Sequence, residues 1–83
     1  MIIPKEANDA FYSGRRSNKI KFVINDTVQI IDGDFEGKEA AVISIESIEP
    51  EVSFLLETFD GTGDIIIPQS SIKLVVASGV GKK

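Results

Sequence analysis

Three acidic side chains alternate with other residues in the stretch IDGDFEGKEAAV, at Asp32, Asp34 and Glu36, and a glycine follows at Gly37. This spacing is typical of a calcium loop between two helices, which has oxygen ligands at positions 1, 3 and 5 and glycine at position 6. That loop also needs a bidentate glutamate at position 12, where this chain has Ile43. Its flanks should be helical, whereas both flanks here have the pattern of β-strands. We therefore expect a solvated acidic turn and no metal site.

The chain offers few residues for catalysis. It has no histidine and no cysteine, which removes the commonest general base, thiolate nucleophiles and disulfides. Asp60 and Asp64 flank one turn and could act as a carboxylate pair, but acids on turns are usually solvated and have ordinary pKa values. Gly61 and Gly63 in DGTGD match no phosphate-binding motif, and the neighbouring acids repel phosphate. We expect neither an enzyme nor a cofactor.

Length and hydropathy predict a small globular protein. The 83 residues suffice for one domain, and 42% hydrophobic residues is ordinary for such a domain. No stretch is long and apolar enough for a membrane span, and Pro4, Lys5 and Glu6 interrupt the apolar run that a signal peptide needs. We therefore expect a cytoplasmic monomer without membrane contact.

Charge is divided unevenly along the chain. Residues 1–21 carry five basic and two acidic side chains, a net charge of +3, whereas residues 22–76 carry two basic and eleven acidic ones, a net charge of −9. An acidic domain of this kind repels a phosphate backbone. Any contact with nucleic acid is therefore expected in the basic segment.

From residue 20 onward, short β-branched runs alternate with turn residues, which is the pattern of an all-β domain. The runs that predict strands are 27–31, 40–48, 52–59, 64–68 and 72–76. Alternation puts Ala41, Ile43 and Ile45 on one face of the second strand. It puts Val52, Phe54 and Leu56 on one face of the third, and in the fifth it predicts that Ile72 and Leu74 face the core.

Five strands this short are too few for a two-sheet sandwich, and a sheet bent into a barrel leaves few free edges. We therefore predict an all-β fold, a small five-stranded SH3-like barrel over residues 20–76. Residues 1–19 are expected to form a flexible basic arm, with a short helical turn around 6–12 and with Phe11 and Tyr12 available to pack onto the domain. Residues 77–83 are expected to form a flexible tail.

The stretch NDTVQIIDGDFEGKEAAVISIE resembles a KOW motif, as found in NusG-type transcription elongation factors and some ribosomal proteins. The residues at matching positions are Asp26, Val28, Ile30, Gly33, Phe35, Gly37 and Val42. The resemblance implies that Asp26, Gly33 and Gly37 shape the turn. Two positions depart from the motif, because Asn25 and Ala40 stand where the family has glycine. Asparagine tolerates the left-handed conformation, but alanine does not adopt it freely.

The stretch FDGTGDIIIPQSSIKLV is similar to the end of the carboxy-terminal domain of NusG-type factors, so the resemblance covers about residues 22–76. It implies a non-catalytic module that binds a protein of the transcription or translation machinery. Carried over by position, the binding residues are Phe59, Asp60 and Ile65, and Phe35 at the tip of the motif loop is a further candidate anchor. The acidic domain favours a basic partner surface, such as that of a ribosomal protein.

RNA binding is the alternative that the same resemblance implies, because KOW domains of ribosomal proteins contact RNA. The segment GRRSNKIK supplies four cations, Arg15, Arg16, Lys19 and Lys21. A basic segment can become ordered on RNA, although short basic runs are more often only solvated. A divergent SH3-like domain with an unrelated role is the third reading, since fold alone does not determine function.

Overall fold

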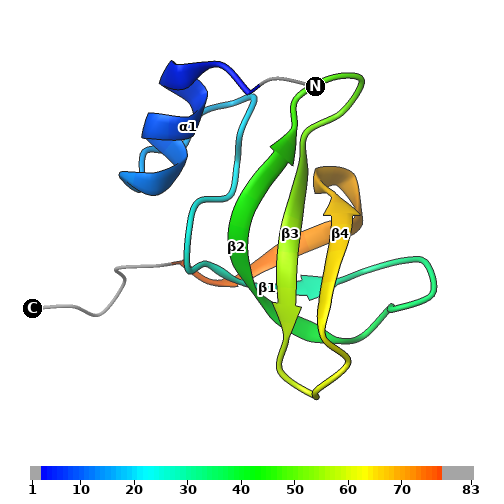
Figure 1. The fold of residues 1–83 in the computed structure, drawn as a ribbon. Helices are drawn as coiled ribbons and strands as arrows, with labels where there is room; N and C mark the ends of the chain where they lie inside the picture. Colours follow the sequence, from blue (N-terminus) through cyan, green and yellow to red (C-terminus); the bar gives the residue numbers. More distant parts are fainter. Residues whose placement is uncertain (1–2, 78–83) are drawn as a thin grey trace, which may run out of the picture.

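The computed structural model describes residues 3–77, which form one antiparallel sheet and one short α-helix (Figure 1). The elements in chain order are α1 (Lys5–Tyr12), β1 (Thr27–Ile30), β2 (Glu39–Ser47), β3 (Ser53–Thr58), β4 (Asp64–Pro68), the 3-10 helix η1 (Gln69–Ser71) and β5 (Ile72–Val76). The five predicted strands are all present, and each predicted end lies within one residue of the observed one. The all-β prediction is therefore confirmed. The predicted tail lies outside the described residues, except for Ala77.

The strands are arranged in the order β4-β3-β2-β1-β5, so β4 and β5 are the two edge strands. Successive strands are neighbours except for β5, which pairs with β1. The sheet is strongly curved, and α1 lies against β2 near one end of that strand (Figure 1). No strand pairing joins β4 to β5 among the described residues, so the sheet is open.

The core-facing residues of β2 differ from those that simple alternation predicted. Ala40, Val42 and Ile45 are buried, whereas Ala41 and Ile43 are only half-buried. The reason is a register shift between Val42 and Ser44 in the pairing of β2 with β3. An extra residue in one strand reverses the alternation beyond it.

The prediction for β3 is confirmed, because Val52, Phe54 and Leu56 are all buried. In β5 the prediction holds for Ile72 but not for Leu74, which remains 43% exposed. Leu74 pairs with Val28 and so lies on the core side of the sheet, but β5 is an edge strand and no further strand covers it.

Residues 1–19 were expected to form a flexible arm, but α1 within this segment packs closely against the core of the sheet. Phe11 of α1 is fully buried, and its ring stacks on Phe54 with 5.9 Å between the ring centroids. Phe22 meets Phe54 edge to face at 5.8 Å, whereas Tyr12 is 49% exposed. Removing a buried phenylalanine side chain typically costs about 3–5 kcal/mol. α1 is thus part of the folded core.

The loop between β1 and β2 has the backbone that its glycines suggest. Gly33 and Gly37 have φ angles of +85° and +93°, and Asn25, in the turn before β1, has φ +70°. The Gly37 N–H donates to the carbonyl oxygen of Ile30 at 2.7 Å, which closes the loop. Ala40, at the position where the KOW motif that the sequence resembles has glycine, is a fully buried residue of β2. The loop therefore closes without a glycine at that position.

Candidate functional site

Phe59, predicted as a binding residue, is the most exposed large hydrophobic side chain of the described residues, at 60%. It follows β3 directly, and its N–H donates to the carbonyl oxygen of Glu39 at 3.0 Å. This bond ties the start of the β3–β4 loop to β2. Because Thr58 before it is buried, Phe59 continues the outward side of β3. The hydrogen-bonded backbone therefore keeps the large apolar side chain of Phe59 exposed to solvent.

Asp60 contacts both its own loop and the loop between β1 and β2. Its carboxylate forms an ion pair with Lys38 and accepts hydrogen bonds from the N–H and the hydroxyl of Thr62, at 3.0 and 2.7 Å. The hydrogen bond from Lys38 and, after it, those from Thr62 hold the pKa of Asp60 well below its usual value. The ordinary pKa expected for an acid on a turn is therefore wrong here. Asp60 orders the loop that carries Phe59.

Ile65, the third predicted binding residue, packs partly against the core, where it pairs with Leu56. Its neighbour Ile66 is 58% exposed and pairs with Leu55, so both lie on the outer face of the sheet. Ile66 was not among the residues predicted from the sequence. Three consecutive isoleucines give no sequence signal for the outward one, and only the burial of Ile67 places Ile66 outward.

Two acids lie between these outward apolar residues. Glu57 and Asp64 are directly opposite each other across β3 and β4, and both are exposed. Along the outer face of β3, Glu57 follows Leu55 and precedes Phe59. We call this set of five residues, Leu55, Glu57, Phe59, Asp64 and Ile66, the hairpin patch. Like charges directly opposite each other destabilise a strand pair, so the Glu57–Asp64 pair is not explained by stability.

The outer edge of β4 is open beside the hairpin patch. The Thr58 N–H donates to the carbonyl oxygen of Gly63 at 3.2 Å, and bonded pairs alternate along an antiparallel ladder. The main-chain groups of Asp64, Ile66 and Pro68 therefore point away from β3. Pro68 has no N–H and Asp64 is charged, and both features discourage indiscriminate pairing of an edge strand.

Phe35, the other predicted anchor, is half-buried and packs against the core from the β1–β2 loop. It does not belong to the hairpin patch. Asp32, Asp34 and Glu36 in the same loop are exposed, and no three acids converge as metal ligands within residues 3–77. The loop has the geometry of a solvated acidic turn.

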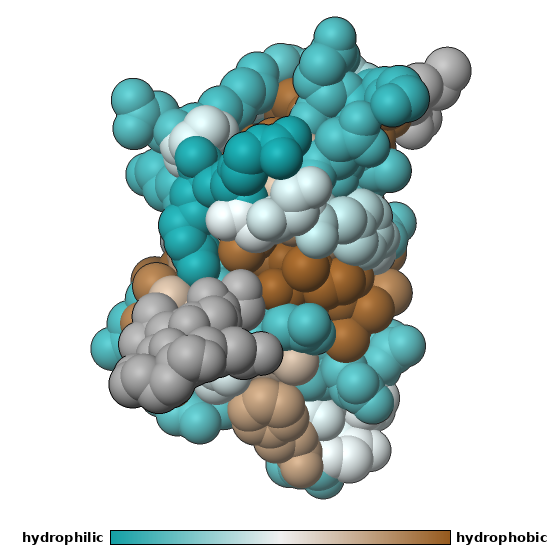
Figure 2. Space-filling view, turned by 90° about the vertical axis from the view of Figure 1, so that its left-hand side faces the viewer, coloured by the Kyte–Doolittle hydropathy of each residue, from teal (hydrophilic) through white to brown (hydrophobic). Residues whose placement is uncertain are grey.

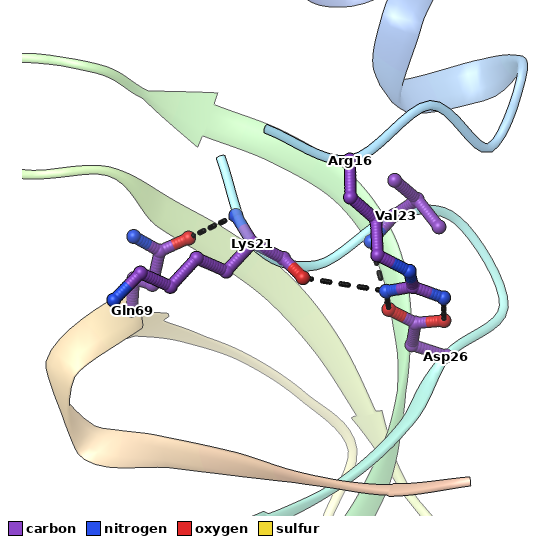
Figure 3. Close-up of polar contacts among 5 residues, drawn as sticks. All are labelled: Arg16, Lys21, Val23, Asp26 and Gln69. Carbon is purple, nitrogen blue, oxygen red and sulfur yellow. Dashed lines mark hydrogen bonds and ion pairs between the residues drawn. The ribbon is translucent and has the colours of Figure 1, made fainter. Parts of the chain in front are cut away.

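Arg16, predicted as an RNA ligand, pairs with Asp26, which is fully buried (Figure 3). The guanidinium binds both carboxylate oxygens, with Nη1–Oδ2 at 2.5 Å and Nη2–Oδ1 at 2.8 Å, and Nη1 also donates to the carbonyl of Lys21 at 3.3 Å. The Val23 N–H donates to Asp26 at 2.9 Å. The hydrogen bonds to Asp26 raise the pKa of Arg16.

Arg16 is therefore unavailable to a phosphate unless Asp26 loses a partner in the interior. Lys19 forms an exposed ion pair with Glu49 at 3.1 Å, and its carbonyl accepts a hydrogen bond from the Gln69 side chain. Of the four predicted RNA ligands, only Arg15 and Lys21 have no ion pair within residues 3–77. The structure thus splits the basic segment into two engaged and two free cations.

The two sets of predicted residues therefore occupy different surroundings. Figure 2 shows the side of the molecule on which β5 ends, with apolar surface at the middle of that side and hydrophilic surface above it.

Within residues 3–77, no helix has the length and hydropathy to cross a membrane. Comparisons of the chain with protein families, curated proteins and solved structures found no match.

Proposed function

We propose that the chain is a non-catalytic SH3-like barrel of the KOW type that binds a basic protein surface through the hairpin patch. The strand order β4-β3-β2-β1-β5, the strong curvature and the 3-10 helix between β4 and β5 support the barrel. The positive φ angles of Gly33 and Gly37 support the KOW motif. The resemblance in sequence supports a role in transcription or translation, in the cytoplasm.

The observation that carries the proposal is the exposure of Phe59 and Ile66, at 60% and 58%, on either side of an acidic pair. Large apolar side chains held in water beside charged ones are typical of protein interfaces, where they act as anchors. Glu57 and Asp64 repel each other in the free domain, and a cation placed between them removes that repulsion.

This arrangement defines the chemistry of the partner. Leu55, Glu57 and Phe59 follow one another at every second residue of one strand face, with steps of roughly 7 Å. The matching surface presents an apolar group, a lysine or arginine, and a second apolar group at the same spacing. An extended basic segment can reach this spacing and can also pair with the open edge of β4.

The test is capture of proteins from a lysate of the source cells with immobilised wild-type chain and variants. We expect Phe59→Ala and Ile66→Ser each to lose most of the partner, because anchors of this kind often contribute 2 kcal/mol or more to binding. Tyr12→Ala is the matched control, since Tyr12 is 49% exposed on α1, outside the hairpin patch. Equal recovery by all three variants would mean that the hairpin patch is not the binding site.

Binding of RNA through the basic segment remains the second candidate, favoured only by the two free cations Arg15 and Lys21. The same capture experiment separates the two functions. Recovery that survives nuclease treatment and depends on Phe59 supports protein binding. Recovery that disappears with nuclease, or with Arg15→Ala and Lys21→Ala combined, supports RNA binding. Arg16 is left unchanged in this test because its loss would disturb the fold.

A further inference from the structure

The two edges of the sheet are protected to different degrees. The β4 edge has a proline and a charged residue, as described above. On β5, the consecutive residues Leu74, Val75 and Val76 are 43%, 44% and 51% exposed, and the strand contains no proline and a single charged residue, Lys73. A run of three exposed apolar residues on an edge strand favours pairing with another strand, and Lys73 is the one side chain of β5 whose charge opposes it.

The main chain of β5 offers partners for such pairing. The Ile31 N–H donates to the carbonyl oxygen of Ser71 at 2.8 Å, and Ile30 pairs with Ile72. Because bonded pairs alternate, the N–H and C=O groups of Ile72 and Leu74 point away from β1. Within the described residues no backbone hydrogen bond outside the sheet uses them.

We propose that the β5 edge pairs with the β5 edge of a second copy of this chain, antiparallel and centred on Leu74. In this register the two Leu74 residues exchange their outward N–H and C=O groups across a two-fold axis. Each Lys73 then lies opposite Val75 of the other copy. A register centred on Lys73 would also pair the outward groups of Ile72 and Leu74, but it would place the two Lys73 side chains directly opposite each other, which is unfavourable.

The proposal accounts for the half-exposed position of Leu74. Its side chain lies on the core side of the sheet and has no neighbour beyond β5. In the pair, the two Leu74 side chains cover each other and extend both cores across the axis. Two five-residue strands form an interface smaller than the roughly 1,600 Å² of a standard complex, so we expect a weak, concentration-dependent dimer. This differs from the monomer that the sequence predicted.

Charge substitutions at Val75 test the register by sedimentation equilibrium over a wide range of protein concentration. Val75→Lys places a cation opposite Lys73 of the other copy, and Val75→Glu places an anion there. Two such contacts per dimer should raise the dissociation constant about 2- to 30-fold for Val75→Lys and lower it by a similar factor for Val75→Glu. Net charge alone predicts the opposite signs, because the chain carries −4.

Two further measurements complete the test. Combining Lys73→Glu with Val75→Lys should restore dimerisation, and the control Tyr12→Lys, on α1, should leave the dissociation constant unchanged. A monomer at every concentration, or equal effects of the two Val75 substitutions, would overturn the proposal. Protection of the Leu74 amide from hydrogen exchange that is independent of concentration would also overturn it, because the chain itself would then cover β5.

Discussion

Two ion pairs in this domain have similar chemistry and opposite surroundings. Arg16 binds Asp26 with both nitrogens, and the Asp26 side chain is fully buried while Arg16 is 32% exposed. Lys38 binds Asp60, and 32% and 47% of their side chains are exposed. The first pair joins the N-terminal segment to the residue just before β1, ten positions along the chain, and the second joins two loops, 22 positions apart.

Burial decides what each pair does. A carboxylate that is buried away from water is stable in its charged form only beside its cation. Removing the cation of a buried ion pair typically costs about 3–5 kcal/mol of folding stability. An exposed pair is screened by water and salt, and contributes little to stability. The first pair therefore fixes the fold, and the second orders the loop that presents Phe59. Among the residues singled out from the sequence, Arg16 and Asp26 therefore serve the fold, whereas Asp60 supports the proposed binding residue Phe59.

The strongest test of this comparison is Arg16→Ala. We expect a loss of about 3 kcal/mol in the free energy of unfolding, near the lower end for a buried pair because Arg16 is partly exposed. Chemical denaturation followed by circular dichroism measures the change. Arg15→Ala is the control, since Arg15 is exposed and has no ion pair within residues 3–77, and surface changes usually stay within about 0.5 kcal/mol. Equal effects of the two variants would contradict a structural role for the Arg16–Asp26 pair.

The pairing of Arg16 with Asp26 also shows where sequence reasoning stops. Five strands were predictable because β-branched runs, prolines and glycine turns are local signals. The ion pair was not, since Arg16 and Asp26 are ten residues apart and meet only because the chain between them turns back. Arg16 was therefore interpreted as a free cation. Arg15, its neighbour in sequence, belongs to the same run of basic residues but forms no ion pair within residues 3–77.

Face assignments failed for a different reason. In the candidate site, Ile65, Ile66 and Ile67 are identical in hydropathy, so the alternation gives no phase and the exposed one could not be identified. In β2, alternation with a period of two residues was predicted correctly, but the register shift between Val42 and Ser44 exchanges the core face and the outer face on one side of it. Phe59 was singled out only through the resemblance to NusG-type domains, by its position in the matching stretch and not by a local pattern. One contact that holds its loop is the ion pair of Asp60 with Lys38, and no local pattern in the sequence connects these two residues.

A second test compares Asp60 before and after its partner is removed. The hydrogen bond from Lys38 lowers the pKa of Asp60, so its carbon resonance should titrate below the usual value of about 3.9. Because the folded pKa is depressed, the stabilisation is present above the unfolded pKa and is lost as pH falls through the folded one. In Lys38→Met the midpoint should rise toward the usual value. An unchanged midpoint would mean that the Thr62 hydrogen bonds alone depress it.

The smallest expected effect is that of salt on folding stability. The Debye length falls from about 30 Å at 0.01 M salt to about 3 Å at 1 M, which screens exposed pairs far more than buried ones. The difference in unfolding free energy between wild type and Arg16→Ala should therefore stay nearly constant across this range. The difference between wild type and Lys38→Met should be too small to detect at high salt. If salt removed the Arg16 effect as well, Asp26 would have to be reached by water, and the distinction between the two pairs would disappear.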